Sequence, residues 1–296
     1  MIFLNKTKIA LFITITLWAS AFVGIREGLQ GYSPGGMALL RFSVASICLL
    51  MIYFFLPVRN KISFSDKFLM MLMGGFGVGC YNLTLNYGEV SIPSGVASFI
   101  ISQSPIITAI FAIIFLSEAF NLYLFLGMAV SIFGVGLITL DSLQQFDLRI
   151  GLLYVVIATL IGSVYTVLQK PFLKKYHAIE ITLYAMLGAT TCLLIYIPNA
   201  IHDIKTASLN ATLAVIYLGI FPAAIAYAAW GYVLNDISAS KASSFLYFMP
   251  VIATLLGWFF LGEVPASLTL LGGIIALLGV WIVNQFSRSK NTSHRT

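Results

Sequence analysis

Polar and aromatic side chains recur at helical spacing inside long apolar stretches of this sequence, where an unpaired polar group is costly. In one stretch Asn82 and Asn86 lie four residues apart, directly after Tyr81. In another stretch Tyr227 and Trp230 lie three residues apart. Amide groups and aromatic rings in a nearly uncharged setting suit a compact, partly apolar, zwitterionic molecule. The pattern therefore predicts a binding site and not a catalytic one.

Residues of the same chemistry lie on helical faces of four other apolar stretches. Ser98 and Ser102, for example, occupy successive turns of one face. The predicted substrate-binding set gains the following members: Trp18, Ser98, Ser102, Tyr165, Ser243 and Tyr247. Any one of the aromatic residues can instead serve helix packing or the membrane interface. The prediction therefore depends on the whole set.

The groups that commonly carry catalysis or bind metals are few and scattered. The histidines are His177, His202 and His294, and the cysteines are Cys48, Cys80 and Cys192. The sequence has no HExxH motif and no acid at the centre of an apolar stretch, so it indicates no catalytic residue, no metal and no cofactor. These observations disfavour an intramembrane enzyme or a receptor. A channel is disfavoured too, since no charged ring or filter-like loop is present.

Composition places the whole chain in a membrane. Of its 296 residues 60% are hydrophobic and only 9% are charged, against about 25% charged in soluble domains. Ten stretches approach the roughly 20 residues that cross a bilayer. They are 9–28, 36–56, 67–88, 93–116, 122–141, 149–170, 179–198, 211–233, 239–262 and 267–286. We therefore predict an all-α membrane protein with ten transmembrane helices, whose partner is a lipid bilayer and not nucleic acid.

The chain repeats itself with an offset of 145 residues. Matched pairs are Pro105 and Pro250, Glu118 and Glu263, Gly127 and Gly272, and Gly134 and Gly279. Each repeat holds five predicted spans, an odd number, so the second copy is inverted relative to the first, as in many secondary transporters. The predicted domains are residues 9–141 and 149–286, followed by a polar cytoplasmic tail at 287–296.

The placement of lysine and arginine orients the chain. With a cytoplasmic N-terminus, twelve of these residues lie in inside segments and three, Arg26, Arg149 and Lys205, lie outside. The positive-inside rule then puts both termini in the cytoplasm. The net charge of +6 is thus a sign of topology and does not imply an acidic partner.

Breaks at corresponding positions of the repeats indicate where a cavity is expected. Pro105 and Pro250 interrupt the fourth and ninth spans. Pro222 interrupts the eighth span, and its repeat counterpart in the third span is Gly77. Paired interruptions of this kind surround transporter binding sites. Simple packing kinks are the alternative interpretation.

Arg41 is the deepest charge in any predicted span. It can extend to the outer surface, pair with Glu89 or Glu27 as an outer gate, or attract a substrate carboxylate. The lack of a central acid disfavours obligatory proton antiport and leaves facilitated export or exchange open. We include Arg41 and Glu89 with the paired helix breaks as gating residues.

Two further pairs are predicted to be structural. Glu118 and Glu263 follow the apolar runs, where a carboxylate can cap the backbone N–H groups of the next helix. The paired glycines of the fifth and tenth spans lie seven residues apart, a spacing that permits close helix approach. That approach joins either the two halves or two copies of the chain in a homodimer.

The motifs of both halves resemble those of a known family. The residues concerned are Leu116-Ser117-Glu118 after Pro105, Leu261-Gly262-Glu263 after Pro250, Trp18-Ala19-Ser20-Ala21-Phe22, and Arg41-Phe42. Over residues 9–286 the chain is similar to proteins with two EamA domains, of the drug/metabolite transporter superfamily. The resemblance implies export or exchange of small metabolites, most of all amino acids, through the cell inner membrane. The alternative is a multidrug carrier, or a carrier of another metabolite such as a nucleoside or an S-adenosylmethionine-like molecule.

Overall fold

A computed structural model describes residues 6–57, 59–92, 94–119, 121–140, 149–261 and 267–286, and every regular element in these ranges is a helix. The first half contains α1 (Lys6–Gly28), α2 (Pro34–Phe54), α3 (Phe64–Gly74), η1 (Gly75–Cys80), α4 (Tyr81–Ser91), α5 (Ser94–Ile101), α6 (Ser104–Leu116) and α7 (Leu122–Leu140). The all-helical prediction is confirmed for the described residues.

The second half begins after the segment 141–148, which is outside the description. It contains α8 (Arg149–Leu168), α9 (Lys170–Leu173), α10 (Ala178–Cys192), η3 (Leu193–Tyr196), α11 (Ile197–Thr206), α12 (Leu209–Leu218), η4 (Gly219–Ile225), α13 (Ala226–Asp236), α14 (Ala239–Ser244), η5 (Phe245–Tyr247), α15 (Phe248–Leu261) and α16 (Ser267–Phe286). Each predicted span overlaps one or more of these helices. The predicted tail at 287–296 and Glu263 lie outside the described residues.

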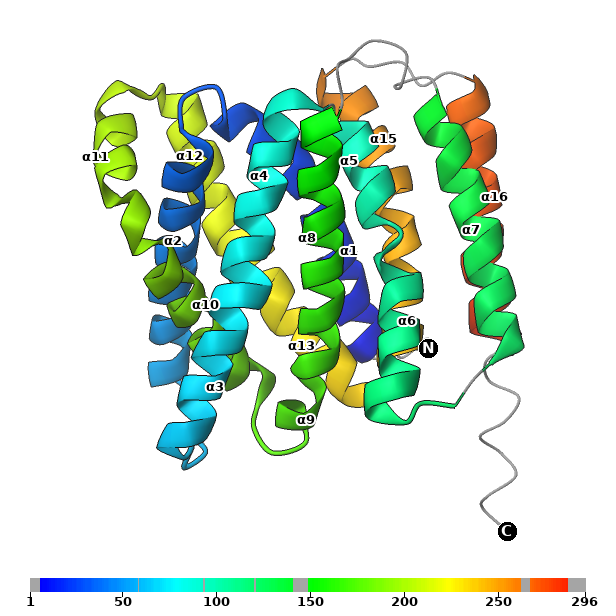
Figure 1. Cartoon of the computed structure of the whole chain (residues 1–296), viewed down its shortest axis with the longest axis horizontal. Helices are drawn as coiled ribbons and strands as arrows, with labels where there is room; N and C mark the ends of the chain where they lie inside the picture. The colour runs from blue at the N-terminus through cyan, green and yellow to red at the C-terminus, as the bar shows by residue number, and fades with distance from the viewer. Residues whose placement is uncertain are drawn as a thin grey trace.

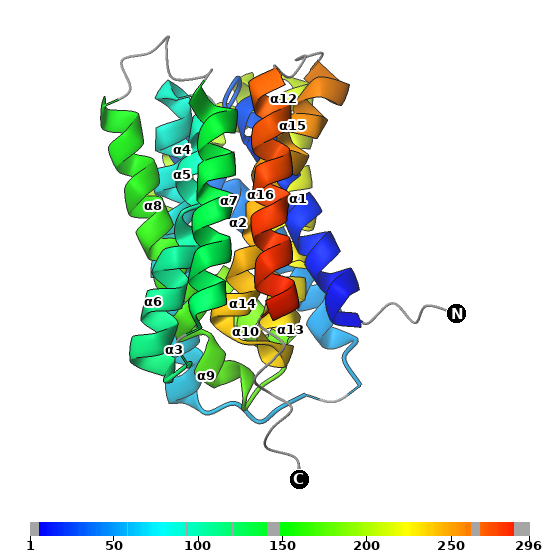
Figure 2. The same ribbon diagram turned by 90° about the vertical axis from the view of Figure 1, so that its right-hand side faces the viewer.

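The helices stand side by side and run alternately up and down in one bundle (Figure 1). Among the described residues, six helical segments are long and apolar enough to cross a membrane: Lys6–Gly28, Pro34–Phe54, Phe64–Ser91, Ile150–Leu173, Ala178–Thr206 and Leu209–Asp236. Shorter apolar helices occupy Ser104–Leu116, Leu122–Gly134 and Leu270–Val283. The chain is therefore a multi-pass membrane protein. Its first helix starts, and its last one ends, in the lower half of the bundle in Figure 2.

The predicted continuous span over 93–116 is two helices in the structure. α5 ends at Ile101 and α6 begins at Ser104, with Pro105 in its first turn. Proline is favoured in a first turn, because the missing N–H would have had no partner there. Pro250, the repeat counterpart, is the third residue of α15, directly after the 3₁₀ segment η5. The first span is thus broken by the turn at residues 102–103, whereas the second continues from α14 through η5 into α15 and changes only its helix type.

Two π-helical segments occupy corresponding places in the two halves. η1 contains Gly77, and η4 contains Pro222. A π-helical turn widens the hydrogen-bonding pattern, and such turns are frequent at functional sites. Each one redirects the side chains that follow it, on α4 and on α13.

The paired glycines join the two halves within one chain. α7 and α16 lie against each other (Figure 2). A side-chain carbon added at Gly127 would meet Gly279 and Val283, and one added at Gly134 would meet Gly272 and Ala276. Ser131 donates a hydrogen bond to the carbonyl oxygen of Ala276 at 3.0 Å. Of the two arrangements the sequence left open, the structure contains the contact between halves.

Candidate functional site

A cavity lies between the two halves, with walls from α1, α2, η1, α4, α5, α6, α8, α13, η5 and α15. It is lined by Trp18, Ala21, Phe22, Ile25, Arg41, Gly77, Tyr81, Asn82, Leu85, Ile101, Ser104, Thr159, Gly162, Tyr165, Thr166, Tyr227, Trp230, Leu246 and Met249. The volume of the cavity is about 70 Å³, measured as the space open to the centre of a water-sized sphere. At roughly 10–15 Å³ for each water, this space holds several waters or a small solute.

Many lining residues are repeat counterparts of one another. With the offset of 145, which holds from Gly74 onward, the pairs are Asn82 and Tyr227, Leu85 and Trp230, Ile101 and Leu246, and Ser104 and Met249. One of these pairs is in direct contact, because Asn82 Nδ2 donates to the Tyr227 hydroxyl at 3.4 Å. The two halves therefore present equivalent positions to the same space, although the side chains differ.

Aromatic rings form a cluster on one side of the cavity. The Trp18 and Tyr227 ring centroids are 5.1 Å apart in an edge-to-face arrangement, and Trp18 and Trp230 are 5.4 Å apart. Tyr165 approaches Tyr227 at 6.1 Å. Trp18 Nε1 donates to the carbonyl oxygen of Pro222 at 3.1 Å, which ties α1 to the π-helical segment η4. The ring faces are thus held in place by packing across the two halves.

Two glycines make room for the tyrosines of this wall. A side-chain carbon at Gly77 would lie 2.5 Å from Tyr165 Cδ2, and one at Gly162 would lie 3.1 Å from Tyr81 Cε2. The first distance is shorter than real carbon contacts allow, so Tyr165 keeps its position only beside a glycine. Gly77 therefore shapes the cavity wall as well as lying in a helix break.

Arg41 is the one charged side chain among the described residues of the cavity wall. It is only 3% exposed, so it does not extend to the outer surface. Its Nε and Nη1 atoms have no hydrogen-bond partner, and neither does Nε1 of Trp230, which is 1% exposed. Buried donors without a partner are uncommon, since each costs about 1–3 kcal/mol. Arg41 and Trp230 thus both line the cavity and both carry buried donor atoms without a protein partner.

The predicted binding residues divide into two groups. The cavity brings together Trp18, Tyr81, Asn82, Tyr165, Tyr227 and Trp230, with Gly77 and Arg41 from the predicted gate. The structure places Asn86, Ser98, Ser102, Ser243 and Tyr247 in buried positions that do not line it. Asn86 Nδ2 donates to the carbonyl oxygen of Pro34 at 3.0 Å, and Ser243 Oγ donates to the carbonyl oxygen of Ser240 at 3.0 Å.

Sequence reasoning missed four polar or small lining residues: Ser104, Thr159, Gly162 and Thr166. Thr159, Gly162 and Thr166 follow the spacing i, i+3, i+7 on α8, which is one helical face. That spacing is visible in the sequence and could have identified the face. Both threonine hydroxyls bond to backbone carbonyls of their own helix, Thr159 to Val155 at 2.8 Å and Thr166 to Gly162 at 3.0 Å.

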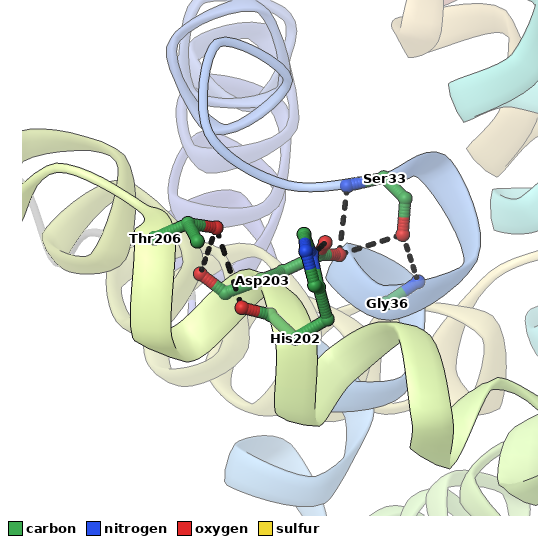
Figure 3. A network of polar contacts seen from close by, with 5 residues as sticks. All are labelled: Ser33, Gly36, His202, Asp203 and Thr206. Carbon is green, nitrogen blue, oxygen red and sulfur yellow. Dashed lines mark hydrogen bonds and ion pairs between the residues drawn. The ribbon is translucent and has the colours of Figure 1, made fainter.

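A different kind of polar contact holds the upper end of the bundle in Figure 1. The Asp203 carboxylate of α11 accepts hydrogen bonds from Ser33 N at 2.9 Å and from Ser33 Oγ at 2.6 Å (Figure 3). Ser33 Oγ also accepts from Gly36 N at 3.2 Å and so caps α2. His202 Nδ1 lies 3.6 Å from Asp203 Oδ1. These contacts tie the start of α2 to the other half of the chain.

A matching contact holds the lower end. Glu118 accepts from Ala239 N at 2.7 Å, and from Ser240 N and Oγ at 3.2 and 2.5 Å. The predicted capping role is therefore present, but on α14 of the other half, whereas the expected target was the next helix, α7. Lys170 Nζ donates to the carbonyl oxygens of Leu234 and Ile237, at 2.7 and 2.5 Å, at the end of α13.

Within the described ranges there is no group of three or more His, Cys, Asp or Glu side chains that could hold a metal ion.

At the lower end of the bundle, the Tyr176 hydroxyl donates to Asp66 at 2.5 Å, and this hydrogen bond raises the pKa of Tyr176. The arrangement of the site is suited to binding, since no acid–base or nucleophilic pair faces the cavity among its lining residues.

Comparison with protein families gives a match for the EamA-like transporter family over residues 5–140 and 149–285. A probable terminal-alkyne amino-acid exporter of Streptantibioticus cattleyicolor is 35% identical over 95% of this chain and 94% of its own. The uncharacterized transporter YdfC of Bacillus subtilis is 36% identical over 90% of this chain and 87% of its own.

A relative of lower sequence identity is also described as a membrane transporter. The uncharacterized inner membrane transporter YedA of Escherichia coli K12 is 29% identical over 93% of this chain and 89% of its own. One solved structure superposes with a TM-score of 0.75 at 17% identity, covering 94% of this chain and 96% of that one. At that identity the likeness concerns the fold alone.

Proposed function

The chain belongs to the EamA-like transporter family, and from this membership we propose that it exports or exchanges small metabolites, above all amino acids, across the cell inner membrane. As a multi-pass protein with transporter relatives, the chain fits a carrier and not an enzyme. The observation that carries the proposal is the cavity between the halves, to which both halves contribute equivalent positions.

The mechanism that fits this cavity is alternating access between inverted repeats. The support is geometric: residues 145 positions apart meet at Asn82 and Tyr227 and again at Ser131 and Ala276. Contacts between repeat counterparts are expected where a pseudo-two-fold axis passes through the bundle. With ten spans and both termini in the cytoplasm, the two halves are oppositely oriented. Each half then closes one side of the same site.

The two ends of the bundle supply the closing contacts of such a cycle. Asp203 joins α11 to the start of α2 at one end, and Glu118 joins α6 to the start of α14 at the other. Each contact links one half of the chain to the other half. Breaking one and keeping the other opens the cavity to a single side.

The chemistry of the wall favours amino acids within the class of small metabolites. Aromatic and aliphatic side chains dominate it, with amide and hydroxyl groups between them and one cation, Arg41. A compact molecule with an apolar side chain and a carboxylate matches these groups. The relative from Streptantibioticus cattleyicolor, a probable exporter of terminal-alkyne amino acids, is of the same kind.

The test is transport by the purified protein in proteoliposomes. Vesicles are loaded with leucine, methionine, phenylalanine or an amino acid with a terminal alkyne, and exchange is measured against external labelled substrate. Uridine, S-adenosylmethionine and a cationic dye represent the alternative carrier. Exchange of at least one apolar amino acid above empty vesicles is expected. Transport of the alternative compounds alone would replace the amino-acid proposal.

A homodimer remains a prediction. Within the described residues, the glycine faces of α7 and α16 pack on each other, so they are not available to a second copy. Cross-linking in native membranes tests whether another surface joins two chains.

A further inference from the structure

We propose that Arg41 binds the carboxylate of the transported molecule, so that the cavity selects α-amino acids over analogues with a neutral head group. The inference rests on the proposed function. It starts from the guanidinium group, which lines the cavity, is 3% exposed and has no partner for Nε and Nη1. Nη1 is the terminal nitrogen cis to Cδ, so it and Nε donate in different directions.

A carboxylate is the ligand that matches a buried cation with unpaired donors. A hydrogen bond from a guanidinium N–H to a carboxylate oxygen joins opposite charges, whereas a neutral amide offers an acceptor oxygen without the charge. Arg41 carries the single formal charge of the described wall, so one carboxylate neutralises it. The hydroxyl groups of Tyr81 and Tyr227 line the same cavity and are further donors to an anion.

The rest of the wall suits the other parts of an α-amino acid. No acidic side chain lines the described cavity, so an ammonium group has aromatic rings as its partners, and Trp18, Tyr165 and Tyr227 are among the lining residues. Leu246 and Met249 add an apolar surface for a side chain. A second positive charge on the substrate would find no acid, so basic amino acids are disfavoured.

A structural role for Arg41 is the competing explanation. Glu89 on α4 is also buried, at 9% exposure, but it does not line the cavity. If Arg41 serves only to balance Glu89, removing either charge has the same effect on the protein. If Arg41 binds substrate, the two variants differ, because only Arg41 discriminates between head groups.

The experiment compares leucine with leucinamide as competitors of labelled leucine exchange in proteoliposomes. The variants are Arg41→Gln, Arg41→Lys and Glu89→Gln, with Arg26→Gln as the matched control, since Arg26 is exposed at the end of α1. Binding to each variant is also measured from tryptophan fluorescence, because Trp18 and Trp230 lie in the cavity. Thermal melting establishes that each variant is folded.

Wild-type protein should prefer leucine to leucinamide, and Arg41→Gln should weaken leucine binding roughly 10- to 100-fold, the factor for a lost charged hydrogen bond. Leucinamide binding should change little, Arg41→Lys should be intermediate, and Arg26→Gln should match wild type. Undiminished preference for leucine in Arg41→Gln, or equal loss in Glu89→Gln, overturns the inference alone. A wild-type protein that exchanges no amino acid overturns the proposed function, and the inference with it.

Discussion

The cavity wall and the helix ends both contain charged groups, but they treat these groups in opposite ways. At the helix ends Glu118 accepts from the backbone N–H groups of Ala239 and Ser240, and Glu180 accepts from those of Asn60 and His177. In the cavity, Arg41 keeps two donor atoms without a partner. The ends therefore use carboxylates to hold helices together. In the described cavity wall, two donor atoms of the single cation have no protein partner.

This contrast has an energetic meaning. A buried polar group that is fully bonded adds stability, whereas one without a partner subtracts the cost of desolvation until a ligand supplies the bond. Loss of stability is thus the expected result of removing an end carboxylate. Loss of binding with a gain of stability is expected on removing the unpaired cation. Four substitutions test the contrast, from the largest expected effect to the smallest.

Glu118→Ala should lower the free energy of unfolding by about 2–3 kcal/mol, because it removes the acceptor for two backbone N–H groups and a hydroxyl. Thermal melting in detergent measures the change. The preference for leucine over leucinamide should remain. Glu27→Ala is the control, since the bond from Gln30 to Glu27 is solvent-exposed. A Glu118 variant with normal stability and altered selectivity would contradict the contrast.

Gly77→Ala should destabilise the protein by about 1–3 kcal/mol and also reduce transport roughly tenfold, because the new carbon would displace Tyr165. Gly273→Ala is the matched control, because the nearest atom to an added carbon there is 3.9 Å away. Melting and exchange assays are run on both variants. Equal behaviour of the two would show that the close contact at Tyr165 has no importance.

Arg41→Met should raise the free energy of unfolding by about 1–2 kcal/mol in the absence of substrate, since an apolar side chain of similar length replaces a buried unpaired charge. Leucine binding should fall at the same time. Melting curves with and without leucine separate the two effects, because only wild type should be stabilised by the ligand. A destabilised Arg41→Met protein would show that Arg41, like Glu118, stabilises the fold.

Ser117→Val should cost about 1–2 kcal/mol and leave binding unchanged, so its total effect is the smallest of the series. Ser117 ends α6 with φ at 53°, in the left-handed region that β-branched residues avoid. Ser117→Gly is the matched variant and should melt at or above the wild-type temperature. Its repeat counterpart in the sequence is already a glycine, Gly262. Equal melting of the valine and glycine variants would show that this turn bears no strain.

Helical-face reasoning succeeded where the helices are continuous and failed beside the breaks. Ser243 and Tyr247 share a face only if 3.6 residues make each turn, but the 3₁₀ segment η5 changes the rotation between them. Leu246 and Met249 face the cavity instead, while Tyr247 packs among apolar residues of α7 and α16. In the first half, Ile101 and Ser104 line the cavity on either side of the break, in place of Ser98 and Ser102.

The sequence also did not show which turn of a helix faces the cavity. Asn82 and Asn86 share a face of α4, yet only Asn82 lines the cavity, because the Pro34 carbonyl of α2 binds Asn86 one turn further on. Glu118 was predicted to cap a helix. Its partner, α14, lies 121 residues away in the chain. No local pattern encodes such a distant contact.

The sequence by itself determined the membrane setting, the helical class, the repeat and the family, because hydropathy, spacing and local motifs are properties of neighbouring residues. The tertiary structure decided which faces surround the cavity, which half each end carboxylate holds, and that Arg41 keeps its donor atoms unpaired. Those features depend on helix breaks that rotate side chains and on contacts between distant segments. They exist only once the two halves are packed together.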